Sequence, residues 1–244
     1  MSQPWIIVPA AGQGRRMGAD KPKQYLTLND EQPILAHTLA RLHSAFPNAR
    51  LVLCLDDDDR WFSPRWVPFA EWQRVSGGHE RMDSVLNALL AMAAQEDDIV
   101  MVHDVARPCI TSVDLHGLYQ AALVHSAGAL LSMPVADTMK RADSQGLSER
   151  TESRDGLWHA LTPQGFRYAL LRRALEAACQ QNTLVTDEAS AVEALGERPQ
   201  LVSGRRDNVK ITHPDDLALA AAIMASQASQ ANQDFDEQML NHKG

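Results

Sequence analysis

The chain has 244 residues, of which 45% are hydrophobic and 22% are charged, so it can bury a full core and falls within the size of one α/β domain. Its net charge of −8 argues against a nucleic-acid or anionic-membrane surface, because such partners are held by basic patches that neutralise phosphates. Cys54, Cys109 and Cys179 form no CxxC pair, which favours a reducing cytoplasm over a disulfide framework or a zinc site. There is no signal-peptide pattern and no apolar run near the roughly 18 residues that span a bilayer, so we expect a soluble, unprocessed protein.

Short apolar runs alternate with helical periodicity along most of the chain, which indicates a mostly parallel sheet covered by helices on both faces. In order, we predict strand Trp5–Ala10, a helix near Pro33–Ala45, strand Arg50–Leu55, a strand ending at Ser76, a helix near Arg81–Ala94, strand Ile99–Val102, a helix near Val113–Ser126 and strand Ala129–Val135. The polar segment 137–158 interrupts this alternation and is predicted to form a projecting hairpin.

The last third of the chain resumes the alternation. Thr162 is a plausible N-cap with Pro163 at the first helical position, so we predict a helix from there. A strand at Gln200–Val202 and a final helix opened by residues 212–216 follow, and the end from 227 to 244 lacks periodicity and is expected to fray.

The first strand leads into a glycine-rich, basic loop, "PAAGQGRRMGADKPKQ". It lacks the Gly-Lys-Ser/Thr ending of a P-loop, and Met17 occupies the position of the third glycine in a dinucleotide fingerprint. What remains is a loop whose amides can approach a phosphate chain, with added charge from Arg15, Arg16, Lys21 and Lys23. The loop is therefore predicted to bind a polyphosphate.

Two further motifs follow predicted strands. In "HDVARP", Asp104 is a candidate ligand for Mg²⁺, which takes few carboxylates and completes its shell with water and phosphates; a turn aspartate paired with Arg107 is an equal alternative, and His103 fits a buried structural role. In "SGGHERMDSV", the glycines precede a helix whose first amides could meet a base or a phosphate, although an ordinary turn, with Ser84 as a cap, is equally possible.

Two late motifs are ambiguous on local grounds. In "DNVKIT", Lys210 alternates with apolar residues, as on the solvent side of a short edge strand. In "TDEAS", Thr186 is a predicted helix cap. Since no G-x-S-x-G, H-E-x-x-H or Cys/His pairing is present, the cations, the carboxylate and the glycine loops favour phosphoryl or nucleotidyl transfer.

Taken together, "VPAAGQGRRMGADKPKQY", "GGHERMDSV", "HDVARP", "DTMKR", "DGLWHALTPQ", "TDEASA" and "DNVKIT" occur in the order seen in the 2-C-methyl-D-erythritol 4-phosphate cytidylyltransferase family, which the chain resembles from about Trp5 to Ala225. The resemblance implies a Rossmann-like fold and a single domain that dimerises through the hairpin at about 137–158. It also implies a Mg²⁺-dependent reaction in which methylerythritol phosphate attacks the α-phosphorus of CTP and releases pyrophosphate.

The resemblance also assigns roles to individual residues. Ala10, Ala11, Gly12 and Gly14 would line the nucleotide, and Gly78 and Ser84 would approach the cytosine. Arg16 and Lys23 would stabilise the pentacovalent phosphorus and the departing pyrophosphate, Lys210 would lie near the α-phosphate, and Asp104 would contact the metal and the ribose. Thr138, Arg154 and Thr186 would hold the methylerythritol phosphate, with Arg107 nearby and Arg154 supplied by the partner's arm.

Two residues depart from the family pattern. Val105 stands where alanine is common, and His79 where an acid or a small polar residue is common, which bears on ribose fit and base selectivity. The alternatives are a cytidylyltransferase for another polyol phosphate, such as ribitol 5-phosphate, and a non-catalytic nucleotide sensor. A sensor would be expected to lose its catalytic cations first, yet they are present.

Overall fold

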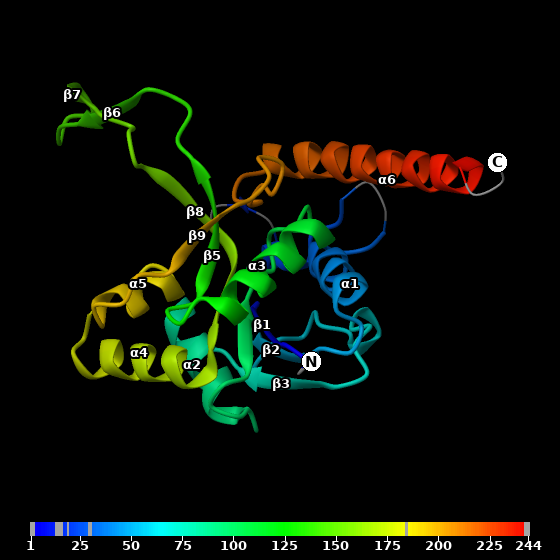
Figure 1. Cartoon of the computed structure of the whole chain (residues 1–244), viewed down its shortest axis with the longest axis horizontal. Coiled ribbons are helices and arrows are strands. Elements are labelled where there is room, and N and C mark those ends of the chain that lie inside the picture. The colour runs from blue at the N-terminus through cyan, green and yellow to red at the C-terminus, as the bar shows by residue number, and fades with distance from the viewer. Residues whose placement is uncertain (1–2, 13–16, 19, 29–30, 184, 242–244) are drawn as a thin grey trace.

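The computed structural model describes residues 3–12, 17–18, 20–28, 31–183 and 185–241. The elements are β1 (Trp5–Pro9), η2 (Lys23–Tyr25), α1 (Ile34–Ala45), β2 (Arg50–Leu55), η3 (Pro64–Trp66), β3 (Trp72–Ser76), α2 (Arg81–Ala91), β4 (Ile99–Val102), α3 (Ser112–Val124), β5 (Ala129–Pro134), β6 (Met139–Ala142), β7 (Ser148–Glu152), β8 (Trp158–Arg167), α4 (Tyr168–Gln180), α5 (Glu188–Ala194), β9 (Gln200–Ser203) and α6 (Asp215–Asn241). They form the predicted α/β fold, a mostly parallel sheet with helices on both faces (Figure 1).

The main sheet has seven strands in the order β3-β2-β1-β4-β8-β5-β9. Every pair of neighbours is parallel except those made by β8, which runs antiparallel to β4 and β5. In the register of the central strands, Ile7 of β1 pairs with Val52 of β2 and Val102 of β4. The carboxyl ends of β1 and β4 therefore meet at one edge, where open α/β sheets bind their ligands.

Side chains alternate between the two faces of the buried strands and so divide the core. Ile6 of β1 belongs to a cluster that packs against α1 and α3, whereas Ile7 belongs to a cluster that packs against α2, α4 and α5. A third, smaller cluster joins Ile211 to Ile34 and Ala220. This third cluster holds the segment that carries Lys210 against the start of α1 and against α6.

The predicted hairpin is present as an arm that we define as residues 137–158. Strands β6 and β7 pair with each other in a separate two-stranded sheet, and they project away from the main sheet (Figure 1). The turn between them is held by the Asp143 carboxylate, which accepts hydrogen bonds from the amides of Gln145 and Leu147. The side chains of the arm are mostly exposed.

The predicted helix start at Thr162 and Pro163 is wrong, because both residues belong to strand β8. The register between β5 and β8 is interrupted between Leu130 and Ser132, and Pro163 lies in the corresponding stretch of β8. A proline, which has no amide hydrogen to donate, is tolerated at such an irregularity. The helix starts five residues later, with α4 at Tyr168.

Three other predicted details also differ. Lys210 lies in irregular chain rather than in a strand, because its segment is held by single contacts such as the hydrogen bond from the Ile211 amide to the Ala106 carbonyl. The cap of α5 is Asp187 rather than Thr186, since the Asp187 carboxylate accepts from the Ser190 amide. The end of the chain, expected to fray from about residue 227, continues α6 to Asn241 through a stretch rich in the helix formers alanine and glutamine.

Within the described part of the chain, no helix is long and apolar enough to cross a membrane.

Candidate active site

Residues from distant motifs line one cavity of about 200 Å³ at the carboxyl edge of the sheet. We call it the nucleotide cavity, after the role that the resemblance implies for its residues. Its lining comprises Pro9, Ala10, Ala11, Gly12, Lys23, Gln24, Gly78, His79, Glu80, Arg81, Ser84, Asp104, Val105, Ala106 and Lys210. The predicted gathering of Lys23, Asp104 and Lys210 is therefore observed. Gly14 and Arg16, which were assigned to the same site, lie outside the described residues.

The loop after β1 is fixed by hydrogen bonds on both sides. The Ala10 amide donates to the Cys54 carbonyl at 2.8 Å, and the Gln24 side-chain amide donates to the Ala10 carbonyl at 2.6 Å. The Lys23 ammonium donates to the Ile211 carbonyl at 3.2 Å, which brings it next to the segment that carries Lys210. Two cations from opposite ends of the chain thus border the same cavity.

The glycine turn before α2 forms another wall. The Gly77 amide donates to the Leu55 carbonyl at 2.7 Å, and the Gly78 amide donates to the Ser84 hydroxyl at 2.9 Å. The helix itself begins with a capping box formed by Glu80 and Asp83. Ser84 therefore both supports the turn and faces the cavity.

Gly77 is required by a close approach of two chain segments, and this gives a testable consequence. A Cβ atom at Gly77 would lie 2.2 Å from the Cβ of Ala11 in the first loop. Overpacking of this kind costs about 1–3 kcal/mol, and about 1.4 kcal/mol corresponds to a tenfold change in affinity. Given the nucleotide role that the resemblance implies for this turn, we expect Gly77→Ala to weaken CTP binding about tenfold, as measured by calorimetry. Gly117→Ala is the matched control, because a Cβ there meets no atom within 4 Å; equal CTP affinities for the two variants would contradict the prediction.

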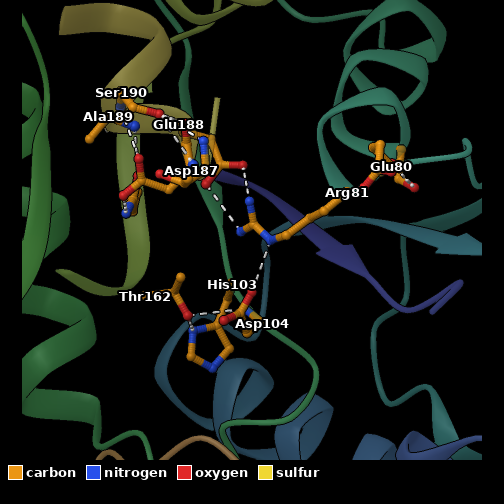
Figure 2. A network of polar contacts seen from close by, with 12 residues as sticks. Glu80, Arg81, His103, Asp104, Thr162, Asp187, Glu188, Ala189 and Ser190 are labelled. Carbon is orange, nitrogen blue, oxygen red and sulfur yellow. Dashed lines mark hydrogen bonds and ion pairs between the residues drawn. The ribbon is translucent and has the colours of Figure 1, made fainter. Parts of the chain in front are cut away.

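Asp104 is surrounded by three cationic side chains (Figure 2 shows the Arg81 side). Its Oδ1 lies 3.1 Å from Arg81 Nε, and its Oδ2 lies 2.8 Å from Lys210 Nζ and 3.5 Å from Arg107 Nε. Burial alone would raise the pKa of this carboxyl group, but the charges of Arg81, Lys210 and Arg107 outweigh burial and hold the pKa well below its usual range. The carboxylate therefore remains charged at any physiological pH.

His103 and Thr162 fix the main chain at Asp104. The Thr162 hydroxyl oxygen accepts from the Asp104 amide at 3.1 Å and lies 3.2 Å from His103 Nδ1, while His103 Nε2 lies 3.2 Å from the Arg107 carbonyl (Figure 2 labels His103, Asp104 and Thr162). Burial lowers the pKa of His103 to about 4, so its ring is neutral at pH 7. A neutral ring that donates from Nε2 and accepts at Nδ1 satisfies both contacts. The buried structural role predicted for His103 is confirmed.

The residues assigned to the acceptor are spread more widely. Arg107 is buried beside Asp104, donates to the Asn208 carbonyl at 2.7 Å, and borders a cleft of about 350 Å³ that Lys210 also lines. Thr186 is exposed and lines a neighbouring cavity of about 460 Å³ between α2, α4 and α5. Thr138 and Arg154 lie on the arm and are exposed, and the Arg154 guanidinium donates to the carbonyl of Ala136, just before the arm in the same chain.

Sequence reasoning missed two charged residues of this network, Arg81 and Glu188. Arg81 lies three positions after Gly78, and its guanidinium lies between Asp104 and Glu188 (Figure 2). Glu188 is only 1% exposed although it belongs to a motif that reads as an ordinary helix start. The signal that could have found Arg81 is its place at the first position of the helix after the glycines, from which a long cation reaches the strand ends.

His79 and Val105, the two departures from the family pattern, both line the nucleotide cavity. His79 is exposed and lies 3.4 Å from the Glu80 carboxylate through its Nδ1. Val105 is buried, and its carbonyl accepts from the Thr38 hydroxyl at 2.7 Å. Both departures therefore lie at the cavity to which the resemblance assigns the nucleotide.

An α/β sheet whose carboxyl edge gathers glycine loops, lysines and an ionised aspartate around one cavity belongs to the nucleotidyltransferase class. A family model described as 2-C-methyl-D-erythritol 4-phosphate cytidylyltransferase matches residues 5–226. The chain belongs to the 2-C-methyl-D-erythritol 4-phosphate cytidylyltransferase family.

Individual relatives agree with this assignment. The chain is 62% identical over 227 residues to a protein of that name from Chromohalobacter salexigens, covering 92% of this chain and 91% of the relative, and 50% identical to one from Tolumonas auensis, covering 91% and 96%. It is also similar to the crystal structure of the Thermus thermophilus protein of the same name, with a TM-score of 0.76, 32% identity, and coverage of 91% of this chain and 98% of that one. A crystal structure titled 4-diphosphocytidyl-2C-methyl-D-erythritol synthase aligns with a TM-score of 0.78 at 35% identity, covering 92% and 100%.

Proposed function

We propose that the chain transfers the cytidylyl group of CTP to 2-C-methyl-D-erythritol 4-phosphate, giving 4-diphosphocytidyl-2-C-methyl-D-erythritol and pyrophosphate in isoprenoid precursor biosynthesis. The observation that carries this proposal is the nucleotide cavity. Ala10–Gly12, Gly78, Lys23 and Lys210 line it together, in a chain that belongs to the family with this activity.

The reaction needs no general base from the protein, because the acceptor's own phosphate oxygen is the nucleophile. That oxygen forms a bond to the α-phosphorus of CTP, and the bond from this phosphorus to the oxygen bridging to the β-phosphorus breaks, so that pyrophosphate leaves with the electron pair. The task of the protein is to align the groups and to stabilise the added negative charge. At about 4 Å, each unit charge pair contributes of order 4 kcal/mol at an effective dielectric constant near 20.

The cations divide this task by their positions. Lys210 lies 2.8 Å from Asp104 and borders both the nucleotide cavity and the cleft shared with Arg107, so it suits the α-phosphate and the incoming acceptor. Lys23 lies on the side of the first loop and suits the departing pyrophosphate. We also assign to Arg16, which lies outside the described residues, the stabilisation of the departing pyrophosphate. Gly14, which likewise lies outside them, is assigned to the loop that binds the nucleotide.

Asp104 fits a Mg²⁺ ion that arrives with the triphosphate. Among the described residues, no group of three or more acidic, histidine or cysteine side chains could hold a metal by itself, so phosphate oxygens would have to supply most of the ligands. Asp104 is ionised, lines the cavity and has a lone pair beyond those that Arg81, Lys210 and Arg107 engage. Bound there, Mg²⁺ would neutralise phosphate charge and orient the chain of phosphates.

The acceptor site is proposed to be completed by a second copy of the chain. Arg154 and Thr138 are exposed on the arm, and Leu147, Leu157 and Trp158 expose apolar surface on the same arm. A homodimer formed through the arm would cover this apolar surface and could bring Arg154 and Thr138 of one subunit to Arg107 and Thr186 of the other. We further propose a single nucleotidyltransferase domain and, from the unpaired cysteines, a cytoplasmic location.

Pyrophosphate release tests the proposed function directly. CTP, UTP, ATP and GTP are each combined with methylerythritol, ribitol and glycerol phosphates in the presence of Mg²⁺. We expect release to be fastest with CTP and methylerythritol phosphate. Faster release with ribitol phosphate would favour the rival polyol, and CTP binding without release from any pair would favour a nucleotide sensor.

A further inference from the structure

Arg81 joins two carboxylates that come from different parts of the fold (Figure 2). Its Nη1 and Nη2 atoms donate to the two carboxylate oxygens of Glu188 at 2.5 and 3.1 Å, and its Nε donates to Asp104 Oδ1 at 3.1 Å. All three elements meet at the ligand edge, since Arg81 opens α2, Asp104 follows β4 and Glu188 opens α5. One planar guanidinium therefore connects the nucleotide cavity to the helix that follows Thr186.

Glu188 is presented from a rigid support. In β8, the Gln164 side chain accepts from the Ala189 amide at 2.8 Å and donates to the Asp187 carboxylate at 2.8 Å. The capping box of Asp187 and Ser190 closes the same turn of α5. With its backbone fixed in this way and its side chain 1% exposed, Glu188 has little freedom to move away from Arg81.

Stability alone does not account for such a buried ionic group. Removing two charges from water is costly, and well-packed apolar side chains of similar volume often stabilise a fold as well as a buried ion pair does. Here the ionic contacts instead fix the orientation of the Asp104 carboxylate, because each of its two oxygens has its own cationic neighbour. Arg81 engages Oδ1, which leaves Oδ2 directed to Lys210.

We propose that Arg81 and Glu188 are positioning residues for the transfer reaction: Glu188 orients the Arg81 guanidinium, and Arg81 fixes the Asp104 carboxylate at the nucleotide cavity. The inference rests on the proposed function, because Asp104 is assigned there to the nucleotide and its metal. It predicts that Arg81 and Glu188 influence turnover only through Asp104.

The decisive variant replaces the pair by apolar side chains, as Arg81→Met combined with Glu188→Leu. We expect this double variant to keep the wild-type Tm or to exceed it, yet to lose about 10–100-fold in kcat, the usual cost of disturbing the residues that orient a ligand, while the KM for CTP changes less than about threefold. A well-folded double variant with wild-type kcat would overturn the proposal. Glu176→Gln is the matched control, because it breaks an Arg–Glu pair of 2.8 Å on α4, away from the cavity, and should change neither kcat nor KM.

If the double variant fails to fold, Glu188→Gln, which keeps the shape of the side chain, takes its place with the same expected loss of kcat. A second comparison tests the route through Asp104. In an Asp104→Asn background, Arg81→Met should lower kcat no further, since the side chain it positions has already lost its charge. A further loss of tenfold or more would show that Arg81 contacts the substrate itself and would overturn the positioning role.

Crystals of Arg81→Met/Glu188→Leu give a readout that does not depend on turnover. We expect the Asp104 carboxylate to rotate away from its wild-type orientation, and an unchanged orientation would contradict the proposal. This measurement remains valid even if the wild-type enzyme prefers another acceptor. The proposed function fails if the wild-type enzyme releases pyrophosphate with another polyol phosphate or with no acceptor at all. The positioning role of Arg81 and Glu188 fails if the Asp104 carboxylate keeps its orientation in the double variant. The two failures are therefore distinguishable.

Discussion

Lys23→Ala is expected to lower kcat by about 10²–10³-fold, the usual cost of removing one preorganised donor from a site where charge develops. The Lys23 ammonium borders the nucleotide cavity and is held near Lys210 by its hydrogen bond to the Ile211 carbonyl. In the proposed mechanism, its interaction with the triphosphate strengthens as the bond to pyrophosphate breaks. An interaction of this kind affects the transition state more than the bound substrate, so kcat should fall more than the affinity for CTP.

Steady-state pyrophosphate release and thermal unfolding of the same samples provide the measurement. Arg173→Ala is the control, because it removes a cation that is exposed on α4. The Tm of both variants should lie close to that of the wild type, since Lys23 is only partly buried. Near-normal turnover of Lys23→Ala would remove this residue from the catalytic assignment.

Arg154→Ala is expected to raise the KM for the polyol phosphate strongly and to leave the CTP affinity almost unchanged. A charge-assisted contact to phosphate contributes about 1.5–3 kcal/mol, equivalent to about a 10–150-fold change in KM at about 1.4 kcal/mol per tenfold. Arg154 lies on the exposed arm, and within its own chain its guanidinium donates to the carbonyl of Ala136, which directly precedes the arm. The nucleotide cavity is lined by none of the arm residues, so CTP should not sense the change.

Mixing the two impaired proteins, assayed at a polyol phosphate concentration well below the KM of Arg154→Ala, tests whether the arm acts across a dimer. If each site combines Lys23 of one subunit with Arg154 of the other, a mixed dimer of Lys23→Ala and Arg154→Ala contains one site that is intact and one that lacks both residues. Activity should then reappear after subunit exchange, at up to about one quarter of the wild-type value when the chains mix at random. A mixture that stays inactive, although exchange is demonstrated by labelled subunits, would show that each site is built from one chain.

The parallel part of the fold could be predicted because its strands are short apolar runs between polar turns. The predicted ranges Arg50–Leu55 and Ile99–Val102 agree with β2 and β4. The sequence could predict that Asp104, Gly78 and Lys23 lie close together, because each follows or borders the carboxyl end of a strand at one edge of the sheet. Local sequence patterns were sufficient where the pattern of a segment is compatible with only one type of secondary structure.

The errors arose where a local signal has two meanings. A threonine followed by proline marks a helix start, but in β8 the same pair fills an irregularity opposite β5, and only the pairing partners show which applies. The contact between Arg81 and Glu188 joins residues 107 positions apart, so no spacing rule could indicate it. Lys210 appeared to alternate on a strand, whereas its position depends on Ile211 packing with Ile34 and Ala220.

The reversed direction of β8 has a consequence for how the acceptor side of the site can evolve. A helix that follows a parallel strand begins at the ligand edge and runs away from it, but α4 follows β8 from the far edge and ends where it lines the cavity beside Thr186. The length of the loop from α4 to α5 therefore influences where Thr186 and Glu188 lie relative to the end of α4. Insertions or deletions in that loop could retune acceptor preference among descendants of this chain while every strand keeps its neighbours.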